Sequence, residues 1–289
     1  MLASPTPSVP HSVGLIDTHC HLEEADFRTA DGADGRAEVL ARAAAAGVVQ
    51  LIVVGSGHGL AEADNAVALA RAHRHLFAAV GIHPHDASAV MAARPPARGG
   101  PTGEALWQAV ERLCWQEPKV VCVGETGLDY HYRHSPPEEQ QALLRRFLRL
   151  SAACGKPVSL HVRDAHEDAR RIVVEEGVTA GVVHCFTGTA DDARAWLDLG
   201  FFISFSGIVT FRTASAIQEA ARLVPPERLL LETDSPYLSP VPLRGRRNEP
   251  AHLCHTAAFV AALRGVTVEE LARQTSAAAR ALFRLPASE

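Results

Sequence analysis

The sequence contains no pair of cysteines in the CxxC arrangement. Its six cysteines are scattered along the chain, and most of them lie in apolar segments. Small secreted domains that depend on disulfides show closely spaced cysteines instead, so this pattern argues against a disulfide framework. We therefore expect reduced thiols and a cytoplasmic location.

Long apolar runs are also missing. Gly47 and Gln50 interrupt the most apolar stretch well before it reaches the length that crosses a membrane. The opening residues, MLASPTPSVP, carry neither a basic segment nor an apolar core, which argues against a signal peptide. We expect residues 1–12 to form a flexible tail, and residues 13–289 to form one domain with no contact to a membrane.

Positive charge is not in excess, because the net charge is −5 and the isoelectric point is about 6.3. Such a chain has no basic face strong enough to wrap duplex nucleic acid tightly, so any contact with nucleic acid has to be local. With 47% hydrophobic and 21% charged residues, the composition is that of a globular protein. No obligate protein partner is predicted.

What the sequence does contain is an alternation of short β-branched runs with longer helical patterns. The runs predict eight strands, at 13–19, 49–55, 76–82, 119–125, 157–161, 180–184, 201–205 and 228–232. Apolar strands separated by helices are typical of a parallel sheet covered on both faces, and eight such units predict a single (β/α)8 TIM barrel. A doubly wound open sheet is the alternative, but no GxGxxG follows the first strand, so its dinucleotide-binding form lacks its main support.

One stretch at the end of the first predicted strand, LIDTHCHLEE, places Asp17, His19 and His21 on alternate positions. In a strand, residues i, i+2 and i+4 project from one face, so we expect the three side chains to converge at the carboxyl end of the strand. This is a metal-ligand arrangement. A polar strand end with a chance pair of histidines remains the alternative at this point.

Other predicted strands end in the same kinds of side chain. In a TIM barrel the active site lies at the carboxyl ends of the strands. Imidazole and carboxylate groups are the ligands that a divalent ion needs while it keeps a position open for water, so we predict a catalytic metal centre at this face. The residues concerned are His83 and His85, Glu125, His161, His184 and Asp234.

At these residues the chain resembles the TatD family of metal-dependent deoxyribonucleases, within the amidohydrolase-like TIM-barrel hydrolases. The similarity runs from about residue 14 to 285 and includes DTHCHL, GIHPH, VGETGLDY, LHVRDA, HCFTG, FISFSGIVTF, ETDSPYL and RGRRNEP. One departure is visible, because the family usually has Asn in its C-terminal T-x-x-N pattern and this chain has Ala278. This change weakens the expectation of a structural cap and not that of the site.

The resemblance implies two divalent ions that share one carboxylate. One ion would be held by His19, His21, Glu125 and Asp234, and the other by Glu125, His161 and His184. The sequence does not distinguish magnesium, manganese and zinc as the metal.

The chemistry that such ligands support is hydrolysis by a metal-activated water. Two ions bridged by a carboxylate lower the pKa of a bound water and neutralise the oxygens of a phosphoryl group, which suits cleavage of a phosphodiester. Asp234 and Glu125 are the expected catalytic carboxylates, and Asp234 is placed to orient the water or accept its proton. We expect His83 to contact the scissile phosphate or to protonate the leaving oxygen; packing beside Pro84 is its alternative.

Further residues concern the substrate, and each has a structural alternative. Arg163 is placed to bind a phosphate, and an ion pair with Asp164 or Glu167 at the start of a helix is the alternative. Aromatic rings that follow two of the strands suit stacking on an unpaired base, or packing at the rim. Arginines after the last strand suit a local phosphate-binding patch, or solvation in a loop. These last two sets are Tyr130 and Tyr237, and Arg244, Arg246 and Arg247.

The substrate that fits these features is an end of single-stranded DNA, because a barrel mouth admits a strand end more readily than the middle of a duplex. The family resemblance implies digestion from the 3′ end, as a 3′–5′ exonuclease. One alternative is a binuclear-metal hydrolase of amide, ester or lactone bonds in a small molecule, although Glu125 stands where such barrels often use a carboxylated lysine. A non-enzymatic, partner-binding protein with a residual metal site is a weaker alternative.

Overall fold

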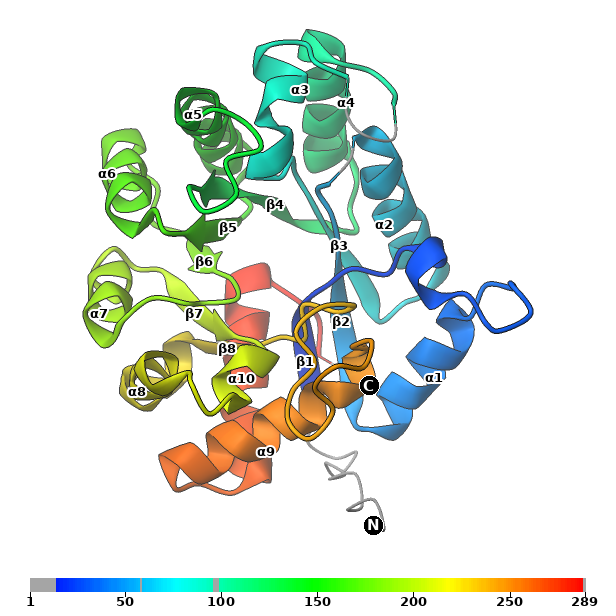
Figure 1. Cartoon of the computed structure of the whole chain (residues 1–289), viewed down its shortest axis with the longest axis vertical. Helices are drawn as coiled ribbons and strands as arrows, with labels where there is room; N and C mark the ends of the chain where they lie inside the picture. Colours follow the sequence, from blue (N-terminus) through cyan, green and yellow to red (C-terminus); the bar gives the residue numbers. More distant parts are fainter. Residues whose placement is uncertain (1–13, 58, 96–98, 288–289) are drawn as a thin grey trace.

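The computed structural model describes residues 14–57, 59–95 and 99–287. In it, eight parallel strands form one sheet in the order β1 to β8 (Figure 1). The amides of Asp234 and His21 donate to the carbonyls of His19 and Ser235, at 2.9 and 2.7 Å, and so join the segment that follows the last strand to the end of the first. The predicted TIM barrel is confirmed. The strands are β1 Leu15–Cys20, β2 Val48–Gly55, β3 Leu76–Val80, β4 Val120–Asp129, β5 Val158–Arg163, β6 Gly181–Val183, β7 Phe202–Phe205 and β8 Leu229–Leu231.

Helices surround the barrel and cover the outer face of the strands (Figure 1). Short 3-10 turns, among them η2 Pro84–Asp86 and η5 Pro250–His252, lie in the connections. The predicted flexible tail at 1–12 lies outside the described residues. The helices are α1 Arg36–Ala45, α2 Leu60–Ala72, α3 Ala87–Met91, α4 Gly103–Gln116, α5 Pro137–Cys154, α6 His166–Glu176, α7 Ala190–Asp198, α8 Ser215–Leu223, α9 Leu253–Arg264 and α10 Val268–Phe283.

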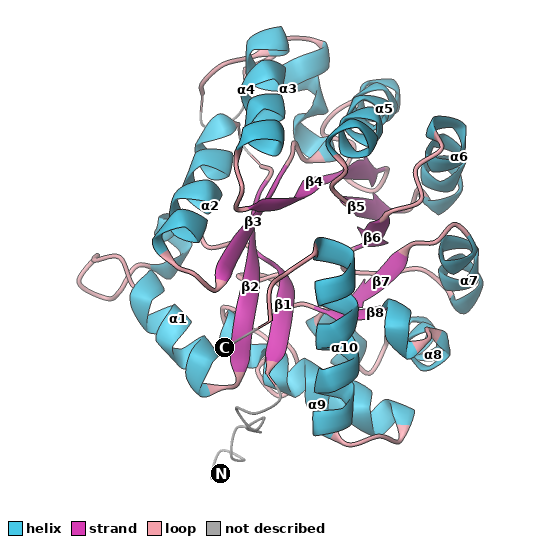
Figure 2. Ribbon diagram, turned by 180° about the vertical axis from the view of Figure 1, so that it is seen from behind, coloured by secondary structure: helices cyan, strands magenta, loops and turns pink. Residues whose placement is uncertain are grey.

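The barrel has two apolar layers, because its strands are buried on both faces. The larger layer packs the strands against the surrounding helices. The smaller layer lies inside the barrel, where side chains such as Ile16, Phe77 and Leu230 pack against Leu282 and Phe283 of α10. Figure 2, seen from behind, shows α10 lying across this end of the barrel. The helix therefore closes the floor, and the opposite end stays available for a site.

Ala278 is part of this floor. It is 4% exposed and lies within α10, five residues before the helix ends at Phe283. The position is therefore not a helix cap in this chain. A small side chain here packs with the apolar side chains of the barrel interior.

Within the described part of the chain, no single helix is long and apolar enough to cross a membrane. The segments Pro250–Arg264 and Val268–Phe283 are long and apolar enough only when taken together, and the chain bends by 106° between them.

Glycines in β4 allow that strand to approach β5 closely beside Glu125. Gly127 has a φ of +150°, and a Cβ at this residue would lie 1.9 Å from the carbonyl oxygen of His161. The neighbouring backbone cannot yield by that much without breaking the pairing of the two strands. The position of Glu125 beside β5 therefore requires glycine at residue 127.

We expect Gly127→Ala to lower the free energy of unfolding by about 3 kcal/mol or more, because the added methyl group collides with backbone. Gly155→Ala is the matched control, since Gly155 also has a positive φ, +65°, but a Cβ there would meet no other part of the protein within 4 Å. It should cost about 1 kcal/mol. Urea unfolding followed by circular dichroism measures both values, and equal losses would contradict the steric argument.

Candidate metal centre

Asp17 does not join the histidines that follow it in β1. Its carboxylate is completely buried, and it accepts hydrogen bonds from the amide and the hydroxyl of Thr233, at 2.9 and 2.6 Å. Burial raises the pKa of Asp17 to about 7. The expectation that all three side chains of the DTHCH stretch converge as ligands is wrong for Asp17, because it ties β1 to the segment after β8.

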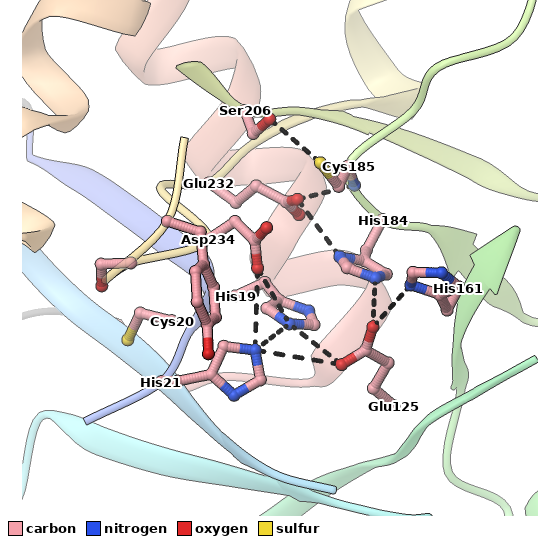
Figure 3. A network of polar contacts seen from close by, with 12 residues as sticks. His19, Cys20, His21, Glu125, His161, His184, Cys185, Ser206, Glu232 and Asp234 are labelled. Carbon is pink, nitrogen blue, oxygen red and sulfur yellow. Dashed lines mark hydrogen bonds and ion pairs between the residues drawn. The ribbon is translucent and has the colours of Figure 1, made fainter. Parts of the chain in front are cut away.

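His19 and His21 do converge, and they meet two carboxylates. Their Nε2 atoms lie 3.2 Å apart. The Nε2 of His19 lies 3.7 Å from both Glu125 Oε2 and Asp234 Oδ1, and that of His21 lies 3.9 and 3.6 Å from the same two atoms (Figure 3). Four ligands about 2.1 Å from a tetrahedral ion lie about 3.4 Å from one another. The spacing of these donor atoms thus fits one divalent ion.

Asp234 reaches this group from a backbone conformation that is uncommon outside glycine. Its φ is +55°, in the left-handed region. The hydrogen bond from its amide to the carbonyl of His19 holds it there, at 2.9 Å. The residue is 9% exposed, so its carboxylate is largely buried, with a small part of it open to solvent.

The other oxygen of Glu125 faces a second group of histidines. Glu125 Oε1 lies 2.7 Å from His184 Nε2, 2.9 Å from His161 Nδ1 and 3.5 Å from His83 Nε2. Figure 3 shows the carboxylate of Glu125 between His161 and His184 on one side and His19 and His21 on the other. The two oxygens of one buried side chain therefore each belong to a separate set of possible ligands.

Among the described residues, the His, Cys, Asp and Glu side chains that are close enough to hold an ion form three overlapping groups. These are His19 with His21 and Glu125, His83 with Glu125 and His161, and His19 with His184 and Glu232. Borderline nitrogen donors and hard carboxylate oxygens together suit zinc or manganese, and the carboxylates also suit magnesium. The residues present therefore fit divalent ions.

The pKa values of this group show that its buried carboxylates attract positive charge, as a metal site does. Burial alone would raise the pKa of Glu125, but His184 beside it holds that pKa well below its usual range. Burial opposes protonation of His184 as well, yet Glu125 and Glu232 raise its pKa well above the usual value. Burial likewise opposes protonation of His21, but Asp234 and Glu125 raise its pKa to about 9. The carboxylates thus favour protonation of the imidazoles of His21 and His184.

His83 is neutral, and its tautomer is fixed by the backbone. It caps the η2 turn, where the amide of His85 donates to His83 Nδ1 at 3.2 Å. Because Nδ1 accepts a hydrogen bond, the ring proton resides on Nε2, the atom that faces His161 and Glu125. Burial lowers the pKa of His83 to about 4. At neutral pH this side chain therefore offers an N–H donor to the centre.

Two buried carboxylates of the centre do not follow from the sequence patterns. Glu232 is completely buried, accepts a hydrogen bond from the amide of Cys185 at 2.6 Å, and lies 3.4 Å from Nδ1 of His184. Asp129 is also completely buried, and its Oδ2 lies 3.1 Å from His161 Nε2. Glu232 lies in the motif ETDSP and Asp129 in GETGLDY. In these motifs the sequence predicts a role only for Asp234 and Glu125.

The residues predicted to contact substrate lie in several different settings. Tyr237 is 59% exposed, and its ring centroid lies 6.1 Å from that of His21. Tyr130 is partly buried, and its hydroxyl donates to Asp168 at 2.9 Å. The guanidinium carbon of Arg163 lies 4.7 Å from the ring centroid of Tyr132, which is 53% exposed.

The arginines after β8 have contacts of their own. The guanidinium carbon of Arg244 lies 4.1 Å from the ring centroid of Phe211. Arg247 donates to the carbonyl of Asp26 at 2.6 Å. Both side chains remain exposed, so these contacts orient them without removing their charge from solvent.

Comparison with known proteins agrees with this geometry. The sequence model of the TatD related DNase family matches residues 16–284. The chain belongs to this family. It is 40% identical to the uncharacterized metal-dependent hydrolase YcfH of Escherichia coli K12, over 95% of this chain and 97% of YcfH. It is 39% identical to the 3′-5′ ssDNA/RNA exonuclease TatD of Klebsiella pneumoniae, over 85% of this chain and 90% of that protein.

A solved structure supports the family assignment. The crystal structure of YjjV, a TatD homologue from Escherichia coli K12, superposes with a TM-score of 0.81 and 30% sequence identity, and covers 94% of this chain and 98% of YjjV. This family member is therefore a metal-dependent hydrolase with a TIM-barrel fold.

We expect metal binding to release protons, because His21, His161 and His184 have raised pKa values in the metal-free protein and must lose a proton to become ligands. Affinity should therefore fall as the pH falls, by about tenfold per pH unit for each proton displaced. Calorimetry with zinc in two buffers of different protonation enthalpy measures the number of protons. Binding without proton release would contradict the assignment of these imidazoles as ligands.

Proposed function

We propose that this family member is a deoxyribonuclease that cleaves phosphodiester bonds of single-stranded DNA as a 3′–5′ exonuclease, with two divalent ions. The observation that carries the proposal is the position of Glu125, whose Oε2 faces His19 and His21 while its Oε1 faces His161 and His184. Such a shared carboxylate suits a pair of ions that act on one phosphoryl group. The name of the Klebsiella relative, 3′-5′ ssDNA/RNA exonuclease, supports the choice of substrate and polarity.

The ions, when bound, would supply Lewis-acid activation of water and would neutralise charge on the phosphoryl oxygens. Asp234 then orients the attacking water and accepts its proton, because it combines access to solvent with a place beside His19 and His21. Its exposure distinguishes it from the more deeply buried Glu125, which serves as a ligand.

His83 serves as a hydrogen-bond donor to the scissile phosphate. Its Nε2–H faces the centre, while its Nδ1 is already bound by the amide of His85. A neutral N–H stabilises negative charge that develops on an oxygen, and it does so without giving up a proton. The fixed tautomer thus favours contact with the phosphate over protonation of the leaving oxygen.

The rim would bind the strand end in two ways. Tyr237 offers an exposed ring beside His21, on which a terminal base can stack. Arg163, Arg244 and Arg247 supply positive charge for phosphates. Tyr130 is bound through its hydroxyl to Asp168, so we assign the second aromatic contact to Tyr132 instead. The acidic chain needs no partner protein for this interaction, and its free thiols suit the cytoplasm.

The test is digestion of 3′-end-labelled and 5′-end-labelled linear single-stranded DNA, beside circular single-stranded DNA, RNA and a panel of amide, ester and lactone substrates. Each reaction contains one divalent ion in turn. The expected result is stepwise shortening from the 3′ end to mononucleotides, with circular DNA intact. Cleavage of circular DNA at the rate of linear DNA would reject entry by a strand end, and turnover of small substrates alone would reject the nuclease.

We expect Glu125→Ala to lower the turnover number by about 1000-fold or more, because the change removes a ligand that both ions share. The variant should still fold, since the barrel core does not depend on this side chain, and circular dichroism checks this. Glu38→Ala removes an exposed carboxylate of α1 and is the matched control, with unchanged turnover. A folded Glu125→Ala variant with near-normal activity would remove this residue from the mechanism.

We expect Ala at Arg244, Arg246 and Arg247 together to raise KM roughly tenfold at low salt and to flatten its salt dependence, because fewer phosphates are neutralised. The turnover number should change little, since these groups bind substrate and transition state equally. Arg112→Ala with Arg273→Ala, on the exposed faces of α4 and α10, is the control for loss of charge alone. An unchanged KM in the triple variant would reject the arginine patch and leave the metal chemistry in place.

A further inference from the structure

Asp129 lies behind the second group of histidines and receives hydrogen bonds on both carboxylate oxygens. Its Oδ2 lies 3.1 Å from His161 Nε2 and 2.9 Å from His85 Nε2. Its Oδ1 accepts from the amides of His131 and Tyr132, at 3.0 and 2.8 Å. A proton on Oδ2 could serve only one of its two imidazole partners, whereas the ionised carboxylate accepts from all four partners, as this geometry requires.

The backbone of Asp129 is itself held in place. Its amide donates to Oε1 of Gln140 at 2.8 Å, and its carbonyl accepts from Nε2 of Gln140 at 3.1 Å. Gln140 lies on α5 and is completely buried, and its Nε2 also donates to the carbonyl of Ser135 at 2.8 Å. The carboxylate of Asp129 is thus a fixed point at the end of β4 and does not adjust to the histidines.

This fixed acceptor determines how His161 faces the centre. An ionised carboxylate only accepts, so Nε2 of His161 must carry a proton. When one proton remains on the ring, Nδ1 is therefore the free donor atom, and it points at Glu125 Oε1, 2.9 Å away. A carboxylate on the far nitrogen of a ligating imidazole fixes its tautomer and makes it a stronger ligand.

The same oxygen also anchors the turn that carries His83. His85 donates its Nε2–H to Asp129, and the amide of His85 donates to His83 Nδ1. The position of His85 therefore sets the orientation of the His83 ring. Through two hydrogen bonds on a single atom, Asp129 connects a candidate metal ligand on β5 with a candidate phosphate contact after β3.

We propose that Asp129 is a positioning residue of the metal centre: it presents Nδ1 of His161 to the second ion and holds the turn from which His83 reaches the substrate. The inference rests on the proposed function in taking the second histidine group as a metal site. It extends that function, because it assigns a purpose to a carboxylate that touches neither ion nor substrate.

The variant that tests this is Asp129→Asn. The new amide keeps an oxygen for the amides of His131 and Tyr132, so the loop after β4 is retained. Its NH2 group, however, faces two N–H donors, which cannot bond to it. His161 must then turn or change its tautomer. A residue that only held the loop would tolerate this change, whereas a positioning residue would not.

The first readout is zinc binding by competition with a chromophoric chelator, without nucleic acid. We expect the weaker of two dissociation constants in the wild-type protein to rise about 10- to 100-fold in Asp129→Asn, and the tighter one to stay within about twofold. Asp192→Asn is the matched control, because Asp192 is a partly buried carboxylate bonded to Thr189 and Arg170 and to no histidine of the centre. Its zinc binding should equal that of the wild type.

The second readout is the protonation state of the His161 ring, from nitrogen-15 spectra of labelled, zinc-loaded protein. In the wild type the proton should lie on Nε2, and in Asp129→Asn this signal should be lost. A folded variant with both zinc constants and the His161 tautomer unchanged would overturn the inference, and so would a wild-type protein that binds one ion. Failure of the proposed nuclease is a separate result, because it appears only with substrate and leaves these binding measurements intact.

Discussion

The carboxylate of Glu125 imposes the constraint on which the rest of the site depends. The residue is 3% exposed, and a buried ionised carboxylate is strongly unfavourable unless positive charge and hydrogen bonds surround it. His161 and His184, from β5 and the end of β6, supply both, and the neutral His83 after β3 adds an N–H group that faces the same carboxylate. The strands of the barrel must therefore end at matching heights, because a shift by one residue in any of them would turn its histidine away.

The protein meets this demand with supports on two sides. Asp17 fastens the end of β1 to Thr233, where the barrel closes on itself. Gly127 lets β4 approach β5, so that Glu125 and His161 face each other. These contacts use short side chains and backbone, and not long flexible ones. Such short supports leave the donor atoms little freedom to move, which lowers the entropic cost of binding an ion.

The sequence predicted the barrel, and it predicted which histidines and carboxylates gather at one end of it, because both follow from the pattern of strands. His19 and His21 follow from alternate spacing in a strand, and His161 and His184 from their place at strand ends. Spacing indicates a face but not which partner a side chain meets on it, so Asp17 was misassigned. Asp129 was missed because β4 runs to that residue, beyond the end predicted at 125. Tyr130 is partly buried and bonded to Asp168, whereas Tyr132 is 53% exposed, and no local pattern in the sequence records this difference.

The helix that closes the floor has a consequence for how the enzyme is made. Among the described residues α10 comes after all the strands, and Asp234 follows β8, so the interior is incomplete until synthesis has passed α10. Contacts between β1 and β8 span more than 200 residues, and such distant contacts form late in folding. A nascent chain thus exposes its histidines without the geometry that makes them a metal centre. Hydrolytic competence therefore requires that α10 has been made and has packed into the barrel.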